Sequence, residues 1–245
     1  MHMADALVSA QVGGVMWAAT IAAATLSIKK IKSGIDEKKI PLMGVMGAFV
    51  FAAQMINFSI PATGSSGHLG GGLLLAALLG PHAGFITMAS ILTVQALFFA
   101  DGGLLALGCN IFNLGFYTCF ISYPFIYKPI VKKGFNLKRL APACLVSGVA
   151  GLQMGSFSVV LETFLSGKSE LPFGTFVLLM QPIHLAIGIV EGAVTCAVLN
   201  FILSARPEIL ENGYDTTRQE GLNIRGVVTA LGISFFLVGG VLSWF

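Results

Sequence analysis

The chain has 245 residues, of which 56% are hydrophobic and only 10% are charged, and its net charge is +3. Soluble domains usually carry about 25% charged residues. Apolar surface on this scale cannot be hidden from water inside one domain, so the composition excludes a soluble globular protein and predicts an integral membrane protein. The four cysteines lie in apolar segments without metal-binding or disulfide spacing, and we interpret them as small buried hydrophobic residues.

Apolar stretches of roughly 20 residues predict membrane-spanning helices. In chain order these are 9–28, 42–60, 69–80, 82–100, 104–127, 140–165, 174–203 and 225–245. Charged loops, glycine and proline separate them. We therefore predict an all-α bundle of seven to eight transmembrane helices. Residues 1–203 would form its core, 204–224 a cytoplasmic linker and 225–245 a C-terminal transmembrane helix.

The number of crossings depends on residues 69–100, which form either one long helix or two passes joined at Gly80-Pro81. Lysine and arginine favour the cytoplasmic side of a membrane. Two passes place thirteen of the fourteen Lys and Arg residues on one side, with Lys168 on the other. One pass would put the basic loop 128–139 on the wrong face. We therefore predict two passes, although 69–80 is short, and an extracytoplasmic N-terminus on the same side as loop 61–68.

The N-terminal sequence Met1-His2 and the loop residue His68 are a candidate metal site. A histidine at position two offers three nitrogens at once: the α-amine of Met1, and the backbone nitrogen and imidazole of His2. His68, in a glycine-rich break between apolar segments, can supply a fourth. Four nitrogens in one plane suit Ni(II) or Cu(II). The alternative is that Met1-His2 is an initiator or cloning remnant and that His68 is an ordinary loop residue.

His184 and Glu191 are seven residues apart, so both lie on one face of the predicted helix 174–203. Ionisable groups deep in a membrane are costly and usually functional. His184 is thus the main rival to His68 as a ligand. The alternative is a hydrogen-bonded His184–Glu191 pair that locks helix packing. We place His82 at the cytoplasmic end without a metal role.

Further polar residues either orient the metal-binding imidazoles or hold the helices together. These are Asp101, Gln54, Asn57, Gln95, Asn110 and Asn113. On the first helix, the small residues Ala18, Ala22, Ala19 and Ala23 form a face that would receive a partner or pack internally.

The same residues allow two other classes of function. Ser65 or Ser66 with His184 would make an intramembrane serine hydrolase of the rhomboid type, although nothing else near these residues supports it. A passive metal channel would need a polar pore, and the sequence has no ring of acidic side chains. HExxH, Walker A and GxGxxG motifs are absent from the sequence, so neither zinc-protease nor ATPase chemistry is encoded.

The chain resembles the CbiM/NikM family, the substrate-capture subunits of nickel and cobalt energy-coupling-factor transporters. The matching stretches are Met1-His2-Met3-Ala4-Asp5, Gly64-Ser65-Ser66-Gly67-His68-Leu69-Gly70-Gly71-Gly72, Leu79-Gly80-Pro81, residues 94–103, residues 107–113 and residues 184–192. The Ser-Gly-His-Leu form of the loop is more similar to the NikM branch. Position three, often isoleucine in the family, is Met3 here, which is a conservative change.

The resemblance implies a non-enzymatic subunit that captures Ni(II) or Co(II) at the outer face of a bacterial or archaeal cell membrane. Its ligands would be the Met1 amine, the His2 backbone nitrogen and imidazole, and the His68 imidazole. The implied partners are a transmembrane coupling (T) subunit and cytoplasmic ATPase subunits in the lipid bilayer, and a small extra membrane subunit is left open. We expect no nucleic-acid partner and no catalytic cofactor.

Overall fold

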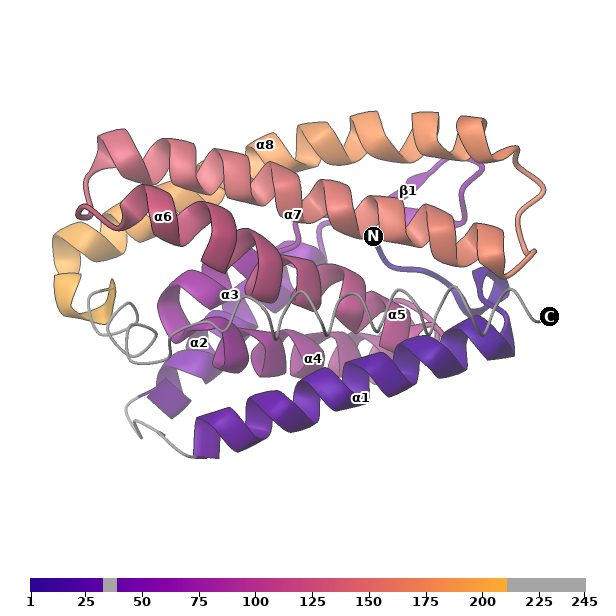
Figure 1. Ribbon diagram of the computed structural model, residues 1–245, viewed down its shortest axis with the longest axis horizontal. Coiled ribbons are helices and arrows are strands. Elements are labelled where there is room, and N and C mark those ends of the chain that lie inside the picture. The colour runs from indigo at the N-terminus through magenta and orange to yellow at the C-terminus, as the bar shows by residue number, and fades with distance from the viewer. Residues whose placement is uncertain (33–38, 211–245) are drawn as a thin grey trace.

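A computed structural model describes residues 1–32 and 39–210 of the chain. Most of the helices run roughly along the long axis of the molecule (Figure 1). Four of them are long and apolar enough to cross a membrane: α1 (Ala10–Lys32), α4 (Pro81–Phe98), α7 (Leu137–Leu165) and α8 (Phe173–Ala205). A fifth apolar helix, α2 (Lys39–Gln54), is shorter. The helical prediction is therefore confirmed for these segments, with ends that shift by a few residues.

The predicted span 42–60 is too long at its C-terminal end. Helix α2 ends at Gln54, and residues that look equally apolar then form strand β1 (Phe58–Ile60). This strand pairs antiparallel with β2 (Ser65–Gly67), so that Ser59 lies opposite Ser66. The all-α prediction contained no such hairpin. The hairpin fixes the position of the chain just before His68.

The break at Gly80-Pro81 is confirmed, but the segment before it is not a full span. Helix α3 (Gly72–Leu79) has eight residues, about 12 Å at 1.5 Å per residue, against a hydrocarbon core of about 30 Å. All eight are buried, so other helices rather than lipid surround α3. A Cβ at Gly84 would lie 2.9 Å from the Ala76 nitrogen, so α4 folds back directly against α3 as a hairpin.

The predicted segment 104–127 forms one helical run with two kinds of turn. Helix α5 (Leu107–Ile111) leads into a π-helix, η2 (Phe112–Tyr127), and then into α6 (Lys128–Val131). Helix η2 lies against α3, α4 and α7 and forms the centre of the bundle. A short 3-10 turn, η1 (Asp5–Leu7), precedes α1.

Helices α7 and α8 pack backbone to backbone along one side of the bundle. A Cβ on Gly192 would lie 2.6 Å from the Leu145 Cα, and one on Gly188 would lie 2.8 Å from the Val149 Cα. Small residues at this spacing allow close helix contact in membranes. Helix α8 ends at Ala205. Most of the predicted linker 204–224 and all of 225–245 lie outside the described residues.

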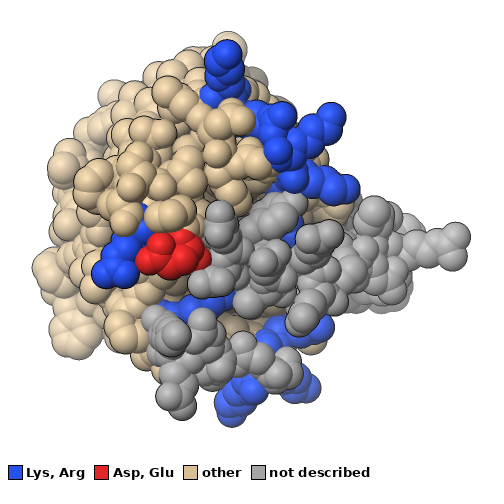
Figure 2. Space-filling model, turned by 90° about the vertical axis from the view of Figure 1, so that its left-hand side faces the viewer, with Lys and Arg blue, Asp and Glu red and all other residues tan. Residues whose placement is uncertain are grey.

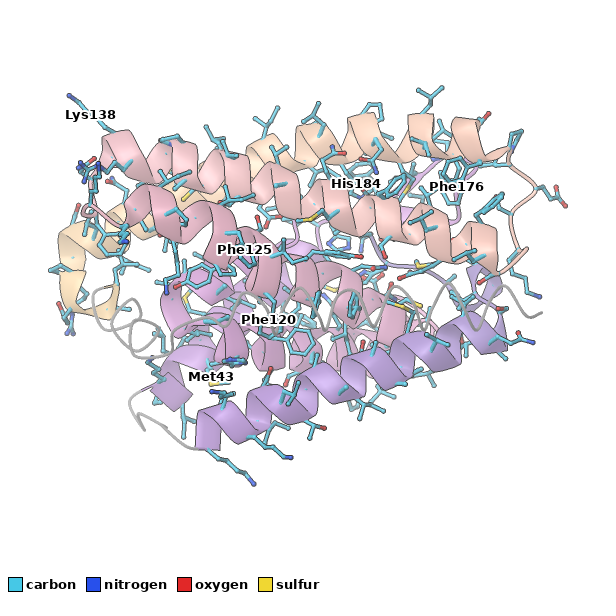
Figure 3. The ribbon with its side chains drawn as sticks, viewed as in Figure 1. Met43, Phe120, Phe125, Lys138, Phe176 and His184 are labelled. Atoms are coloured by element: carbon cyan, nitrogen blue, oxygen red, sulfur yellow. The ribbon has the colours of Figure 1, made fainter. Side chains whose placement is uncertain are left out.

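Positive charge gathers at one end of the molecule. Figure 2 shows Lys and Arg side chains around that end, and Lys138 points away from it in Figure 3. The connection between α6 and α7 and the C-terminal turns of α1 lie there. Lys168 lies between α7 and α8, at the opposite end, where the β-hairpin is also found.

Candidate metal site

The N-terminal segment runs into the body of the protein instead of lying on its surface (Figure 1). Met1 and Met3 are 0% exposed and His2 is 4% exposed. The backbone of Met3 is clamped by the side chain of Asn110, which accepts from the Met3 nitrogen at 2.8 Å and donates to the Met3 carbonyl at 3.2 Å. Asn110 therefore fixes the backbone of the N-terminal segment at the residue after His2.

The β-hairpin and Asp5 fix the same segment from two other sides. The His2 carbonyl accepts hydrogen bonds from the Ser66 nitrogen at 3.3 Å and from the Ser65 hydroxyl at 3.1 Å. The Asp5 carboxylate accepts from the Ala106 nitrogen at 2.9 Å. Gly103 packs so closely on Asp5 that a Cβ would overlap its carboxylate. These contacts consequently fix the N-terminal backbone between Asp5 and the buried Met1.

The sequence-predicted nitrogens of Met1, His2 and His68 come together at that buried end. The Met1 amine lies 3.0 Å from Nε2 of His68 and also donates to the Ser66 carbonyl. The rings of His2 and His68 stack with centroids 4.4 Å apart. Nδ1 of His68 donates to the Leu69 carbonyl at 2.8 Å, which leaves the lone pair on Nε2 toward the amine.

Asp101 contacts the His2 imidazole. Its Oδ1 lies 3.0 Å from Nδ1 of His2, and its Oδ2 accepts from the Asn57 amide at 3.2 Å. Nδ1 is the ring nitrogen that can close a chelate with the backbone nitrogen of the same histidine. Asp101 therefore lies against the ring nitrogen that a chelate of this kind would use.

The site keeps its nitrogens uncharged. Burial lowers the pKa of the Met1 amine to about 4, and the nearby Asp101 carboxylate opposes this shift in part. Burial likewise lowers the pKa of His2. For His68, burial, the amine, His2 and His184 together lower the pKa well below its usual range. Burial alone would raise the pKa of Asp101, but its contacts with His2 and the amine lower it. Neutral nitrogens thus face an ionised carboxylate.

Side chains alone do not make a metal centre in this protein. Among residues 1–32 and 39–210, no three His, Cys, Asp or Glu residues gather around a common point. The grouping at the N-terminus becomes a four-nitrogen set only when the amine and the His2 backbone nitrogen are included. An open depression of about 410 Å³, lined in part by His2, Asp101 and the hairpin turn, connects this region to the outside.

His184 and Glu191 are both buried on α8, but they do not pair with each other. Nδ1 of His184 donates to the Met180 carbonyl at 2.8 Å, while Glu191 accepts from the backbone nitrogens of Gly70 and Gly71. The predicted hydrogen-bonded pair is therefore wrong. Figure 3 shows His184 and Phe176 on the side of α8 that faces the body of the molecule.

The geometry does not support the serine hydrolase. The Ser65 hydroxyl donates to the His2 carbonyl, and nothing in the described part of the chain joins it to His184. The Ser66 hydroxyl and Nε2 of His184 each lack a hydrogen-bond partner among the described residues, so they do not bond to each other. A nucleophile without a base in contact is not activated.

The remaining predicted polar residues divide between the two interpretations. Gln54 donates to the Gly70 carbonyl at 2.6 Å and so holds the loop after His68. Asn113 donates to Glu162 at 2.8 Å, and the side-chain amide of Gln95 contacts the Met55 sulfur at 4.0 Å. Sequence reasoning did not single out Glu162, although an acidic residue inside an apolar helix was a usable signal.

Comparison with known proteins gives a family match over most of the chain. A family model described as "Cobalt uptake substrate-specific transmembrane region" (CbiM) matches residues 2–209. A putative metal transport protein of Haloquadratum walsbyi is 32% identical over 89% of this chain and 96% of its own. A putative fused nickel transport protein, NikMN, of Archaeoglobus fulgidus is 34% identical over 86% of this chain and 68% of its own.

Solved structures give the same result. The crystal structure of a truncated transition metal transporter superposes with a TM-score of 0.76 at 31% identity, over 84% of this chain and 99% of that one. A second transition metal transporter structure gives 0.75 at the same identity. The fold and the matches together define a membrane component of transition-metal transport. The chain belongs to the CbiM family and is a substrate-specific component of a nickel or cobalt transporter, a class that functions with partner subunits.

Proposed function

We propose that this protein captures Ni(II), or Co(II), through the Met1 amine, the backbone nitrogen and imidazole of His2, and the imidazole of His68. One observation carries the proposal: the buried amine lies 3.0 Å from Nε2 of His68, against which the His2 ring is stacked. A free chain end is rarely buried without a purpose, because desolvating an amine is costly.

The electrostatics of the site suit a dipositive ion. The amine and imidazoles are neutral at pH 7, so they do not repel a cation, and the ionised Asp101 beside them attracts one. A planar arrangement of nitrogen donors suits Ni(II) or Cu(II), and of these two ions nickel is the one in the name of a relative. We therefore propose nickel as the main cargo and cobalt as the alternative.

The subunit would take the ion from the extracytoplasmic side and release it inward without catalysing a reaction. The basic end of the bundle, opposite the N-terminal site, supports this orientation in the cell membrane. Energy would come from partner subunits, namely a transmembrane coupling subunit and two cytoplasmic ATPases, with a small extra membrane subunit as a further partner. Residues 1–203 would be the binding unit, 204–224 a linker and 225–245 a last membrane helix.

Metal analysis and visible spectroscopy of the purified protein test this proposal. We expect one bound nickel per chain and the yellow, diamagnetic signature of a planar Ni(II) ion. Protein with His68→Ala should bind nickel more weakly and show a shifted absorption band. A paramagnetic, octahedral spectrum in the wild-type protein would rule out the four-nitrogen plane.

A further inference from the structure

Glu191 joins helix α8 to the loop that carries His68. The residue is 2% exposed, and its Oε2 and Oε1 accept from the backbone nitrogens of Gly70 at 2.6 Å and Gly71 at 3.1 Å. These glycines follow His68 by two and three residues. The Glu191 carboxylate, 121 residues after Gly70 in the sequence, thus holds the backbone next to the proposed ligand His68.

A series of contacts links Gly70 to Nε2 of His68, the proposed ligand atom. Between His68 and Gly70 lies Leu69, whose carbonyl accepts from Nδ1 of His68 at 2.8 Å. That hydrogen bond turns Nε2 of His68 toward the Met1 amine, 3.0 Å away. On the opposite side, Gln54 of α2 donates to the Gly70 carbonyl at 2.6 Å. The position of the Glu191 carboxylate therefore decides where the His68 imidazole is held.

The two glycines of the loop leave room for this contact. A Cβ on Gly70 would lie 2.9 Å from Oε2 of Glu191 and 3.0 Å from the Leu152 side chain, so a larger residue would push the carboxylate away. Gly71 has a φ of 77° in the left-handed region, and a Cβ there would lie 2.5 Å from Val50. Both glycines let the backbone nitrogens turn toward one acidic side chain.

The Glu191 carboxylate also lies at the N-terminus of helix α3. Gly71 is the N-cap of this helix, and its free N–H groups carry partial positive charge. The Glu191 oxygens accept from N–H groups at this end of the helix that no helical carbonyl can reach. Glu191 and α3 therefore stabilise each other in a place where neither has access to water.

We propose that Glu191 is a positioning residue for metal binding, which holds His68 in place through Gly70 and Gly71 and couples helix α8 to the site. This inference rests on the proposed function, since it requires His68 to be a ligand. A displacement of α8 relative to α2 and α3 would move the His68 imidazole away from the other three nitrogens. The same contact would then serve both to hold the ion and to release it.

The test compares nickel affinity and the visible Ni(II) spectrum in the purified full-length chain. Glu191→Gln keeps the size of the side chain but replaces one acceptor oxygen with a donor that faces a backbone N–H. Loss of such an outer contact typically lowers metal affinity about 10- to 100-fold. We expect this loss, and an absorption band shifted toward that of His68→Ala. Glu208→Gln is the control, because it makes the same exchange at an exposed carboxylate that pairs with Arg206 beyond the end of α8. It should keep the wild-type band.

A double variant shows whether Glu191 acts through His68. In a His68→Ala background, Glu191→Gln should change affinity less than about twofold. An equal loss in both backgrounds, or a wild-type band and affinity for Glu191→Gln, would overturn the inference. If Glu191→Gln does not fold, Glu191→Asp replaces it in the same comparison. Absence of nickel binding in the wild-type protein, or normal binding by His68→Ala, would instead refute the proposed function itself.

Discussion

The amine of Met1 is buried, and its partners in the structure are the Ser66 carbonyl and Nε2 of His68. At this position a free amine, and not only the right side chain, is needed for the proposed site. A backbone amide in its place would have to lose its proton before it could bind a metal, whereas a neutral amine has its lone pair available. The proposed site therefore depends on the exact residue at which the mature chain begins.

One glycine added before Met1 should abolish high-affinity nickel binding. The addition turns the amine into an amide and moves the new amine away from the buried site. Isothermal calorimetry on the purified protein measures the effect, and the same glycine added after the last residue serves as the control. Unchanged nickel binding by the N-terminally extended chain would contradict the four-nitrogen site.

Substitution of the three buried histidines should separate ligands from neighbours. His2→Ala removes an imidazole from the chelate and His68→Ala removes the opposite corner, so each should weaken nickel binding by orders of magnitude. His184→Ala should have a smaller effect, because Nδ1 of His184 is bonded within its own helix to Met180. Equilibrium dialysis would settle the order. Loss of binding in His184→Ala together with normal binding in His68→Ala would reverse the assignment.

The buried site changes the expected pH dependence. Ordinary pKa values of about 7.7–8.0 for the amine and 6.5 for imidazole predict more than one proton released per metal and a steep loss of affinity from pH 8 to pH 5. In the structure the amine has a pKa of about 4 and both imidazoles have lowered pKa values. The amine is therefore already deprotonated at pH 7 and competes with the metal only as the pH falls toward 4. The imidazoles take up protons only below their ordinary pKa.

We therefore expect about one proton released per nickel at pH 7, from the His2 amide, with a steeper dependence only at lower pH. Calorimetry in buffers of different ionisation enthalpy counts these protons. A count near zero would exclude coordination by the amide nitrogen. A count of two or more at pH 7 would mean that the amine or an imidazole stays protonated in the ion-free protein.

At the scale of elements, the contact between α7 and α8 sets the position of the helix that carries Glu191. Gly192→Ala should lower stability by about 1–3 kcal/mol, because the new Cβ would meet the Leu145 Cα at 2.6 Å and the helices would have to separate. Thermal unfolding in detergent measures this loss. Gly174→Ala on the same helix is the control, since a Cβ there meets nothing within 4 Å. Equal melting temperatures for the two variants would show that the helices do not depend on this close approach.

At the scale of the whole molecule, charge distribution predicts orientation. Glu170→Cys, between α7 and α8, should react with a membrane-impermeant maleimide added outside intact cells, whereas Lys132→Cys, at the basic end, should react only after the cells are opened. All four native cysteines are buried and should contribute little background. Labelling of Lys132→Cys from outside would invert the proposed orientation and place the metal site on the cytoplasmic side.

The sequence alone was sufficient for properties that depend on local composition. Long apolar stretches predicted α1, α4, α7 and α8, because a helix that crosses a bilayer has to be apolar over its whole length. The separation of basic residues from His2 and His68 followed from the order of those stretches. That Met1, His2 and His68 belong together was also predicted without a structure, since a histidine at position two is a recognisable chelating pattern, and the three residues do lie together. Their role as metal ligands stays a prediction.

Only the tertiary structure decided which buried group meets which. Residues 55–60 are as apolar as a helix end, yet three of them form β1 because β2 offers a pairing partner. Helix α3 is apolar enough for a span but is surrounded by protein, which its own sequence does not record. His184 and Glu191 share one helix face, but their partners come from Met180 and from Gly70 and Gly71. Periodicity tells which side of a helix is buried, whereas the atoms that cover this side come from segments far away in the chain.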